Sequence, residues 1–249
     1  MDGGPDYRNY WPSLREWIQY GGLGVLGAAA LAGLFYRSVL ALCLFLPAGL
    51  CLPLALRPTL AAARRRRLAV QFRDGALAVA SALSVGYSAE NAWAEAAVEM
   101  AVVYGEEGMI TQEFRGICRK LALNQNAEEA VGDLARRSGV PEIEQFAQVY
   151  RAAKRSSGDL APILRDTAAV LSKRIQLQEE IASLVAAKRL EFAIMSLMPA
   201  GILVYINLGS PGFTDPLYQS LAGRVTMTAC LGLYGLAVWL GLKILSVEV

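Results

Sequence analysis

Long apolar segments alternate with a polar, helix-forming middle region along this chain. Four segments are nearly free of charged residues and have the length of a membrane span: 17–36, 39–56, 192–208 and 225–242. A helix needs about 20 apolar residues to cross the roughly 30 Å hydrocarbon layer of a bilayer. The pattern therefore predicts two transmembrane hairpins, over 17–56 and 192–242, with an external loop at 209–224.

These segments differ from the buried helices of a soluble protein. Core helices of soluble domains seldom stay uncharged for so long, and other helices would have to cover them on every side. Aromatic residues lie near the span ends, as they do at membrane interfaces: Trp17, Tyr20, Tyr36, Tyr205 and Trp239. We therefore expect an integral membrane protein with about four transmembrane helices.

The middle region, 57–191, has the pattern of an all-α domain, and we expect an antiparallel helical bundle. Gly86 ends a first helix, and Ser88 is placed to cap the next one. On that second helix Trp93 shares a face with small and apolar residues three and four positions away, which predicts Trp93 as a core anchor. Caps or a proline indicate three more helix starts, at Thr111, Asn126 and Pro141.

The last helix of the middle region begins near Leu160, after a break that contains Gly158. No helix breaker follows before Pro199, so the pattern predicts that this helix continues directly into the third span. A continuous helix would couple the middle domain rigidly to the membrane.

Basic residues predict the orientation, because lysine and arginine are retained on the cytoplasmic side of a membrane. The opposite side would hold only Arg37 and Arg224. The middle region, the N-terminal segment 1–16 and the tail 243–249 are therefore expected in the cytoplasm. The basic residues next to the spans are expected to fix the topology and contact lipid head groups: Arg57, Arg64, Arg65, Arg66, Arg67, Lys188 and Arg189.

Candidate chemistry is sparse. The net charge is only +2, there is no histidine, and the four cysteines form no CxxC pair. No phosphate-binding glycine motif is present, and the adjacent glutamates at 106–107, 128–129 and 179–180 lie in polar helix-surface contexts. The span interiors contain no ionisable residue, which argues against an ion-coupled transporter. We expect a non-enzymatic protein without catalytic residues, cofactor, metal or nucleic-acid partner.

Two stretches of the middle region resemble a known family. The first, from Gln71, reads QFRDGALAVASALSVGYSAENAWAEAA and contains the turn with Gly86 and Ser88. The second, from Glu128, reads EEAVGDLARRSGVPEIEQFAQVYRAAKRSSGDLAPILRDTAAVLSKR and contains the turn with Gly158 and Leu160. Both are similar to the type II secretion system F domain, over about Leu68 to Leu208. A single such domain between two hairpins most resembles the platform proteins of Tad (Flp) pili.

This resemblance implies a platform role in the bacterial inner membrane. Such a protein links a cytoplasmic hexameric secretion ATPase to pilin subunits in the bilayer, beside a second platform protein or another copy of itself. The chain contains one domain copy, whereas the longer platform proteins of classical systems carry two. An F-type component of a sporulation channel and a membrane transporter subunit remain the alternatives.

Overall fold

A computed structural model describes residues 7, 14–36, 43, 46–47, 54, 57–155, 160–210, 212 and 215–247. Every regular element among these residues is an α-helix, which confirms the predicted all-α class. The chain divides into two compact units. We call the unit that takes in 1–11 and 58–177 the helical domain, and the unit that takes in 12–57 and 178–249 the membrane unit.

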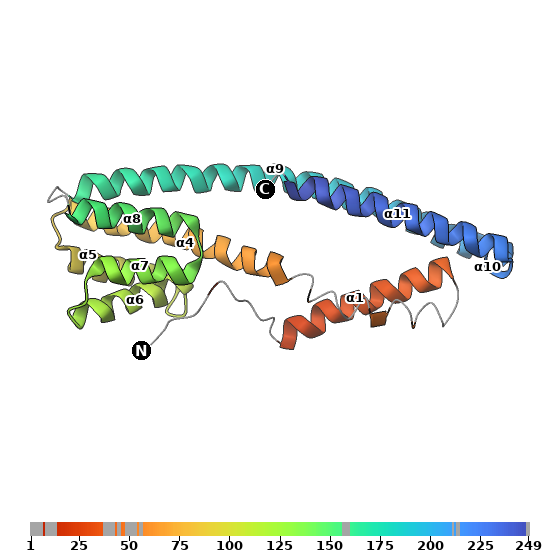
Figure 1. The fold of residues 1–249 in the computed structure, drawn as a ribbon, viewed down its shortest axis with the longest axis horizontal. Helices are drawn as coiled ribbons and strands as arrows, with labels where there is room; N and C mark the ends of the chain where they lie inside the picture. Colours follow the sequence, from red (N-terminus) through yellow and green to blue (C-terminus); the bar gives the residue numbers. More distant parts are fainter. Residues whose placement is uncertain are drawn as a thin grey trace. The chain divides into compact units, whose positions relative to one another are not determined.

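Five whole helices and the beginning of a sixth build the helical domain (Figure 1). Short connections make successive helices neighbours, so α5 packs against α6, α6 against α7, and α7 against α8. The helices are α4 (Arg57–Ser84), α5 (Ala89–Tyr104), α6 (Met109–Ala122), α7 (Ala127–Ser138), α8 (Pro141–Arg155) and the first part of α9 (Leu160–Gly209).

Aromatic rings form the centre of this domain. Trp93 on α5 is fully buried and meets the ring of Phe114 edge-on, with 5.0 Å between the ring centroids. Phe72 from α4 makes edge contacts with Phe114 at 6.2 Å and with Phe146 at 5.3 Å. Edge-to-face pairs suit the charge distribution of aromatic rings and add to the gain from burial. The cluster therefore joins α4, α5, α6 and α8 into one core.

Local signals explain most of the helix ends. Gly86 follows α4 with φ +99°, a conformation that side chains disfavour, and Ser88 caps α5 by accepting a hydrogen bond from the Asn91 amide at 3.3 Å. The expectation of a cap at Thr111 is wrong, because α6 already begins at Met109. The Thr111 hydroxyl is fully buried and instead donates to the carbonyl of Met100 at 3.0 Å, which ties α6 to α5.

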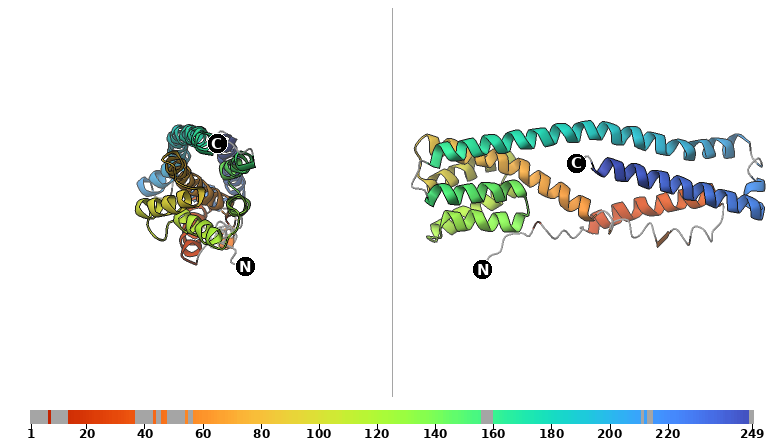
Figure 2. Two further views of the ribbon diagram at one scale, coloured as in Figure 1. Left: turned by 90° about the vertical axis from the view of Figure 1, so that its left-hand side faces the viewer. Right: turned by 45° about the horizontal axis from the view of Figure 1, so that its top comes forward.

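The α9 helix is continuous for 50 residues, from Leu160 to Gly209, and stays unbroken in each view (Figure 2). At 1.5 Å per residue its length is about 75 Å. Pro199 lies inside the helix and does not end it, so the predicted run of this helix into the third apolar segment is confirmed.

The membrane unit contains α1 (Leu14–Phe35), the second part of α9, α10 (Asp215–Gln219) and α11 (Leu221–Val247). The predicted loop 209–224 thus holds a short helix. Three of the described helices are long and apolar enough to cross a membrane: α1, α9 and α11. The predicted span 39–56 lies largely outside the described residues.

Within the membrane unit, α11 contacts the second part of α9 near Ser196 and Phe192. The Tyr234 hydroxyl donates to the carbonyl of Ser196 at 2.6 Å, and Gly241 gives room for the ring of Phe192. Much of the remaining apolar surface is uncovered: Leu197, Met198 and Tyr205 are each more than 60% exposed. Exposed apolar side chains of this kind on a long apolar helix are suited to lipid rather than to water.

Candidate interaction surface

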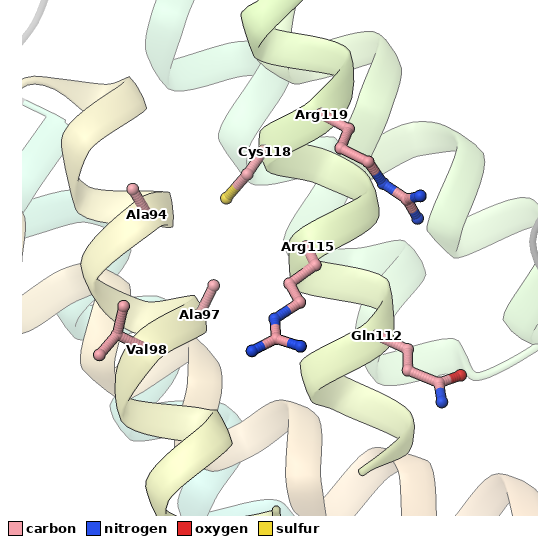
Figure 3. Close-up of a pocket in the computed structure, with 7 residues that line it drawn as sticks. All are labelled: Ala94, Ala97, Val98, Gln112, Arg115, Cys118 and Arg119. Atoms are coloured by element: carbon pink, nitrogen blue, oxygen red, sulfur yellow. The ribbon is translucent and has the colours of Figure 1, made fainter. Parts of the chain in front are cut away.

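A cleft of about 500 Å³ lies between α5 and α6 on the surface of the helical domain. Each of the two helices buries an apolar face in the core and exposes a face of mixed residues. The cleft lies between the two exposed faces. Figure 3 shows small apolar side chains on the α5 wall and longer, mostly polar ones on the α6 wall. The lining residues are Ala94, Ala97, Val98, Gln112, Arg115, Cys118 and Arg119.

The side chains of α6 divide between the cleft and its rim (Figure 3). Arg115 and Cys118 point toward α5, whereas Gln112 and Arg119 extend from the other side of the helix. Arg115 forms an ion pair with Glu106, and both side chains are largely exposed. Burial raises the pKa of the Cys118 thiol, so this cysteine is a protonated, weakly polar part of the wall rather than a nucleophile.

Exposed apolar residues continue beyond the cleft. Val98, Val102 and Val103 on α5 are 61%, 81% and 58% exposed, and Leu123 after α6 is 73% exposed. Exposed apolar side chains beside charged ones are typical of protein-binding surfaces. We call the cleft together with these four residues the α5–α6 face.

A second cleft, of about 450 Å³, lies between α8 and the beginning of α9. Its buried carboxylate, Glu142, is only 6% exposed and lies 3.9 Å from the guanidinium of Arg174. Arg174 also donates to the side chain of Gln145 at 3.1 Å. These contacts tie α9 to α8 across the wall of the cleft.

The buried side of α6 carries an ionic network that connects it to α7. Arg137 donates both terminal nitrogens to the carboxylate of Glu113, at 3.1 and 2.7 Å, and its Nε to Asp133 at 3.0 Å. Lys120 donates to the same Asp133 oxygen at 2.7 Å. Glu113 is only 4% exposed, and a buried carboxylate is stable where a bidentate arginine satisfies it.

The network shifts the pKa values of two of its members, Arg137 and Asp133. The hydrogen bonds to Glu113 raise the pKa of Arg137, which stays charged throughout. Partial burial acts to raise the pKa of Asp133, but the hydrogen bonds from Lys120 and Arg137 outweigh it, so that this pKa is lowered. Both shifts favour the ionised forms of Arg137 and Asp133.

Tyr7 adds an N-terminal residue to this network. Its side chain is 2% exposed, its hydroxyl donates to Glu113 at 3.1 Å, and its amide donates to the carbonyl of Arg137 at 3.1 Å. The guanidinium of Arg64 lies 4.8 Å from the centre of the tyrosine ring, in the geometry of a cation–π contact.

The sequence-predicted residues fall into three groups. Trp93, Gly86 and Ser88 lie in the core or turns of the helical domain, and Leu160 is the first residue of α9; Gly158 lies outside the described residues. The basic residues Arg57, Arg65, Arg66 and Arg67 lie along the start of α4, beside Arg64. Lys188 and Arg189 are exposed on α9, where Lys188 pairs with Glu191 at 2.8 Å.

A scan against protein-family models matches residues 76–207 to "Type II secretion system (T2SS), protein F". The match covers more than half of the chain, from α4 to the end of α9. The chain belongs to this family. The T2SS protein F match includes the α5–α6 face, the buried pair of Glu113 and Arg137, and the whole aromatic core except Phe72.

The protein is therefore a membrane protein of the T2SS protein F family. Neither the curated proteins nor the solved structures contain a match to this chain. Among the described residues there is no group of side chains that could hold a metal ion. The surfaces that the family domain offers are clefts suited to binding other proteins.

Sequence reasoning missed the α5–α6 face and the Tyr7 contacts. Valines at positions 98, 102 and 103 read locally as ordinary helix residues, and only their exposure distinguishes them. The only signal for Tyr7 was an aromatic residue in a polar segment, and its partner Glu113 is 106 positions away.

Proposed function

We propose that this chain is a non-enzymatic platform protein of the inner membrane, in the assembly machine of a Tad (Flp) pilus or a related type II secretion system. The family match over residues 76–207 carries this proposal. In this role the helical domain binds a cytoplasmic secretion ATPase, and the membrane unit contacts pilin subunits and a second platform subunit.

The burial of Tyr7 supports a hairpin topology for the first two apolar segments. Tyr7 packs into the same domain as α4, so both lie on one side of the membrane. The chain between them must then cross the membrane an even number of times. The segment α1 and the apolar run 39–56 satisfy this as a pair of spans. The basic residues at the start of α4 favour the cytoplasm for that side.

The α5–α6 face is our candidate for the ATPase contact. Its α5 wall is apolar, Arg115 points into the cleft, and Arg119 lies on its rim. This combination fits an amphipathic element of the partner that has an apolar face and an acidic edge. Arg115 is already paired with Glu106, whereas Arg119 forms no ion pair with any residue that the structure describes, so Arg119 is the charge that we expect a partner carboxylate to meet.

The continuous α9 helix offers a route from the ATPase side to the bilayer. Its first part packs in the helical domain, where Leu164, Ala168 and Leu171 are buried. Its second part forms an apolar span that lies against α11. A helix without a joint moves as one body, so a displacement at its cytoplasmic end reaches the membrane.

Co-purification tests the partner assignment. The tagged full-length protein is extracted from membranes in mild detergent, and the proteins that accompany it are identified by mass spectrometry. We expect a hexameric secretion ATPase, and we expect Arg119→Glu to remove it while Gln112→Glu, on the same cleft, weakens binding less. Recovery of the ATPase with Arg119→Glu at the wild-type level would reject this face as the contact.

An insertion in α9 tests the coupling. Gly-Gly-Ser-Gly after Ala187 introduces a flexible joint, and we expect it to preserve folding and ATPase binding while abolishing pilus assembly or secretion. Four helix-forming residues at the same place are the control, because they keep the stiffness and nearly keep the helical phase. Wild-type assembly with the flexible insertion would mean that the domain is only a tether for the ATPase.

A further inference from the structure

The contacts around Tyr7 define a socket on the surface of the helical domain, independent of the platform role. We define the Tyr7 socket as Arg64 on α4, Glu113 on α6 and Arg137 on α7, together with the tyrosine that they surround. Three separate interactions converge on one residue: a hydroxyl bond, a backbone bond and a cation–π contact. We propose that this socket is a peptide-docking site, that the chain's own N-terminal segment occupies it through Tyr7, and that this occupation is reversible.

Reversibility follows from how the buried charges are paired. Glu113 accepts two hydrogen bonds from Arg137, and Arg137 also reaches Asp133. All of these bonds persist when Tyr7 leaves, so no buried charge becomes unpaired. Departure exposes one aromatic ring and breaks one hydrogen bond to a carboxylate and one to a carbonyl. The helical domain can therefore exist with the socket empty as well as filled.

The socket also selects the residue that fills it. The Glu113 carboxylate accepts a hydrogen bond from a donor, the Arg64 guanidinium faces an aromatic ring, and the carbonyl of Arg137 accepts a hydrogen bond from a backbone amide. Tyrosine offers all three groups, whereas phenylalanine lacks the hydroxyl donor. The backbone bond further requires that the tyrosine belong to an extended or turn segment whose amide is not used in a helix.

The position of Tyr7 in the sequence means that docking connects the first membrane helix to the helical domain. Residues 8–13 connect Tyr7 to the start of α1 at Leu14, so a docked Tyr7 links the first membrane helix to the helical domain by a route that does not pass through α4 or α9. Both Tyr7 and Arg64 lie outside the region that matches the T2SS protein F model. The Tyr7 socket therefore combines Glu113 and Arg137, inside the matched region, with Tyr7 and Arg64, which precede it.

Peptide binding tests the site directly. A variant of the full chain that lacks residues 1–10 is purified in detergent, and a fluorescein-labelled peptide of residues 1–12 is titrated by fluorescence polarisation. We expect saturable binding to this variant and none to the complete chain, whose socket is filled. The Tyr7→Phe peptide should bind about tenfold or more weakly, since it loses a hydrogen bond to a charged group. The Tyr7→Ala peptide should not bind.

Two results would overturn the proposal. One is an absence of peptide binding to a truncated protein whose α6 and α7 amides keep their protection against hydrogen exchange. The other is loss of that protection on truncation, which would make Tyr7 a fixed part of the core rather than a reversible ligand.

Photo-crosslinking identifies which chain supplies the tyrosine. Benzoylphenylalanine at position 7 of the full chain should crosslink to peptides of α4, α6 or α7 within one chain. A crosslinked dimer instead would refute occupation by the chain's own segment and assign the socket to the N-terminus of a second copy.

Discussion

Replacing Trp93 by alanine probes the core of the helical domain. Trp93 is completely buried and lies against three other rings: Phe114 at 5.0 Å, Tyr150 at 6.0 Å and Phe146 at 6.4 Å between centroids. Its indole nitrogen donates to the Tyr150 hydroxyl at 3.4 Å, which is long, so packing dominates the effect. Truncation of a large buried aromatic costs about 3–5 kcal/mol, and the loss of several ring contacts favours the upper part of that range.

Hydrogen exchange measured by mass spectrometry on the full chain in detergent provides the assay. Each 1.4 kcal/mol corresponds to about a tenfold change, so Trp93→Ala should speed exchange of core α5 and α6 amides by about a hundredfold or more. Peptides from α11, in the other unit, should be unaffected and serve as an internal reference.

Two matched variants calibrate this result. Trp93→Phe keeps an aromatic ring among the three neighbouring rings and should lower the free energy of unfolding by about 1–2 kcal/mol. Val102→Ala, at an 81% exposed position on the same helix, should change stability by less than about 0.5 kcal/mol. If Trp93→Ala speeds amide exchange by less than tenfold, the reasoning is refuted. The core around the indole would then rearrange to fill the space without a large loss of stability.

The remaining predictions concern close packing, pH, topology and nucleotide. A Cβ at Gly75 would lie 2.5 Å from the ring of Phe114, so Gly75→Ala should destabilise the domain by about 1–3 kcal/mol, whereas Gly116→Ala, with nothing nearby, should be neutral or stabilising in the same exchange measurement. Burial raises the pKa of Tyr7 above its ordinary 10.0, and the nearby Glu113 carboxylate adds to this rise, so the docked side chain is the neutral phenol. The affinity of the 1–12 peptide should therefore stay constant below pH 10 and fall as the pH rises above it. The Tyr7→Phe peptide, which has no phenol at this position, should not show this fall. In a background without native cysteines, an impermeant thiol reagent added to spheroplasts should label Ser210→Cys but not Leu123→Cys; the reverse would invert the topology. Equilibrium binding with labelled ATP at millimolar Mg²⁺ should detect no saturable site, since the sequence has no phosphate-binding loop, and micromolar binding by the pure protein would contradict the proposed division of labour.

Local patterns explain why sequence reasoning placed most of the helices. Helix rhythm depends on residues three or four apart, and a cap such as Ser88 acts within its own turn, so both can be read without the tertiary structure. The same holds for α9, whose continuation into an apolar span follows from the lack of a breaker before Pro199. The match to the family over residues 76–207 likewise reflects this local pattern of helices and turns.

Contacts between segments far apart in the sequence determine the side-chain partners that local patterns do not predict. Thr111 is a residue type that often caps helices. In the folded chain its hydroxyl instead donates to the carbonyl of Met100, on the other side of the α5–α6 turn. Nothing in the local sequence distinguishes Glu113 and Arg137 from surface charges, and only the packing of α6 on α7 buries the carboxylate and pairs the two.

Helical character, long apolar segments fit to cross a membrane and a domain without recognisable catalytic motifs can all be read from the residue pattern. The folded chain alone shows which helix faces stay uncovered, as at Val98 and Val102, and that Tyr7 contacts Glu113. Propensity and periodicity act over a few residues, whereas exposure and ion pairing depend on which surfaces the folded chain brings together.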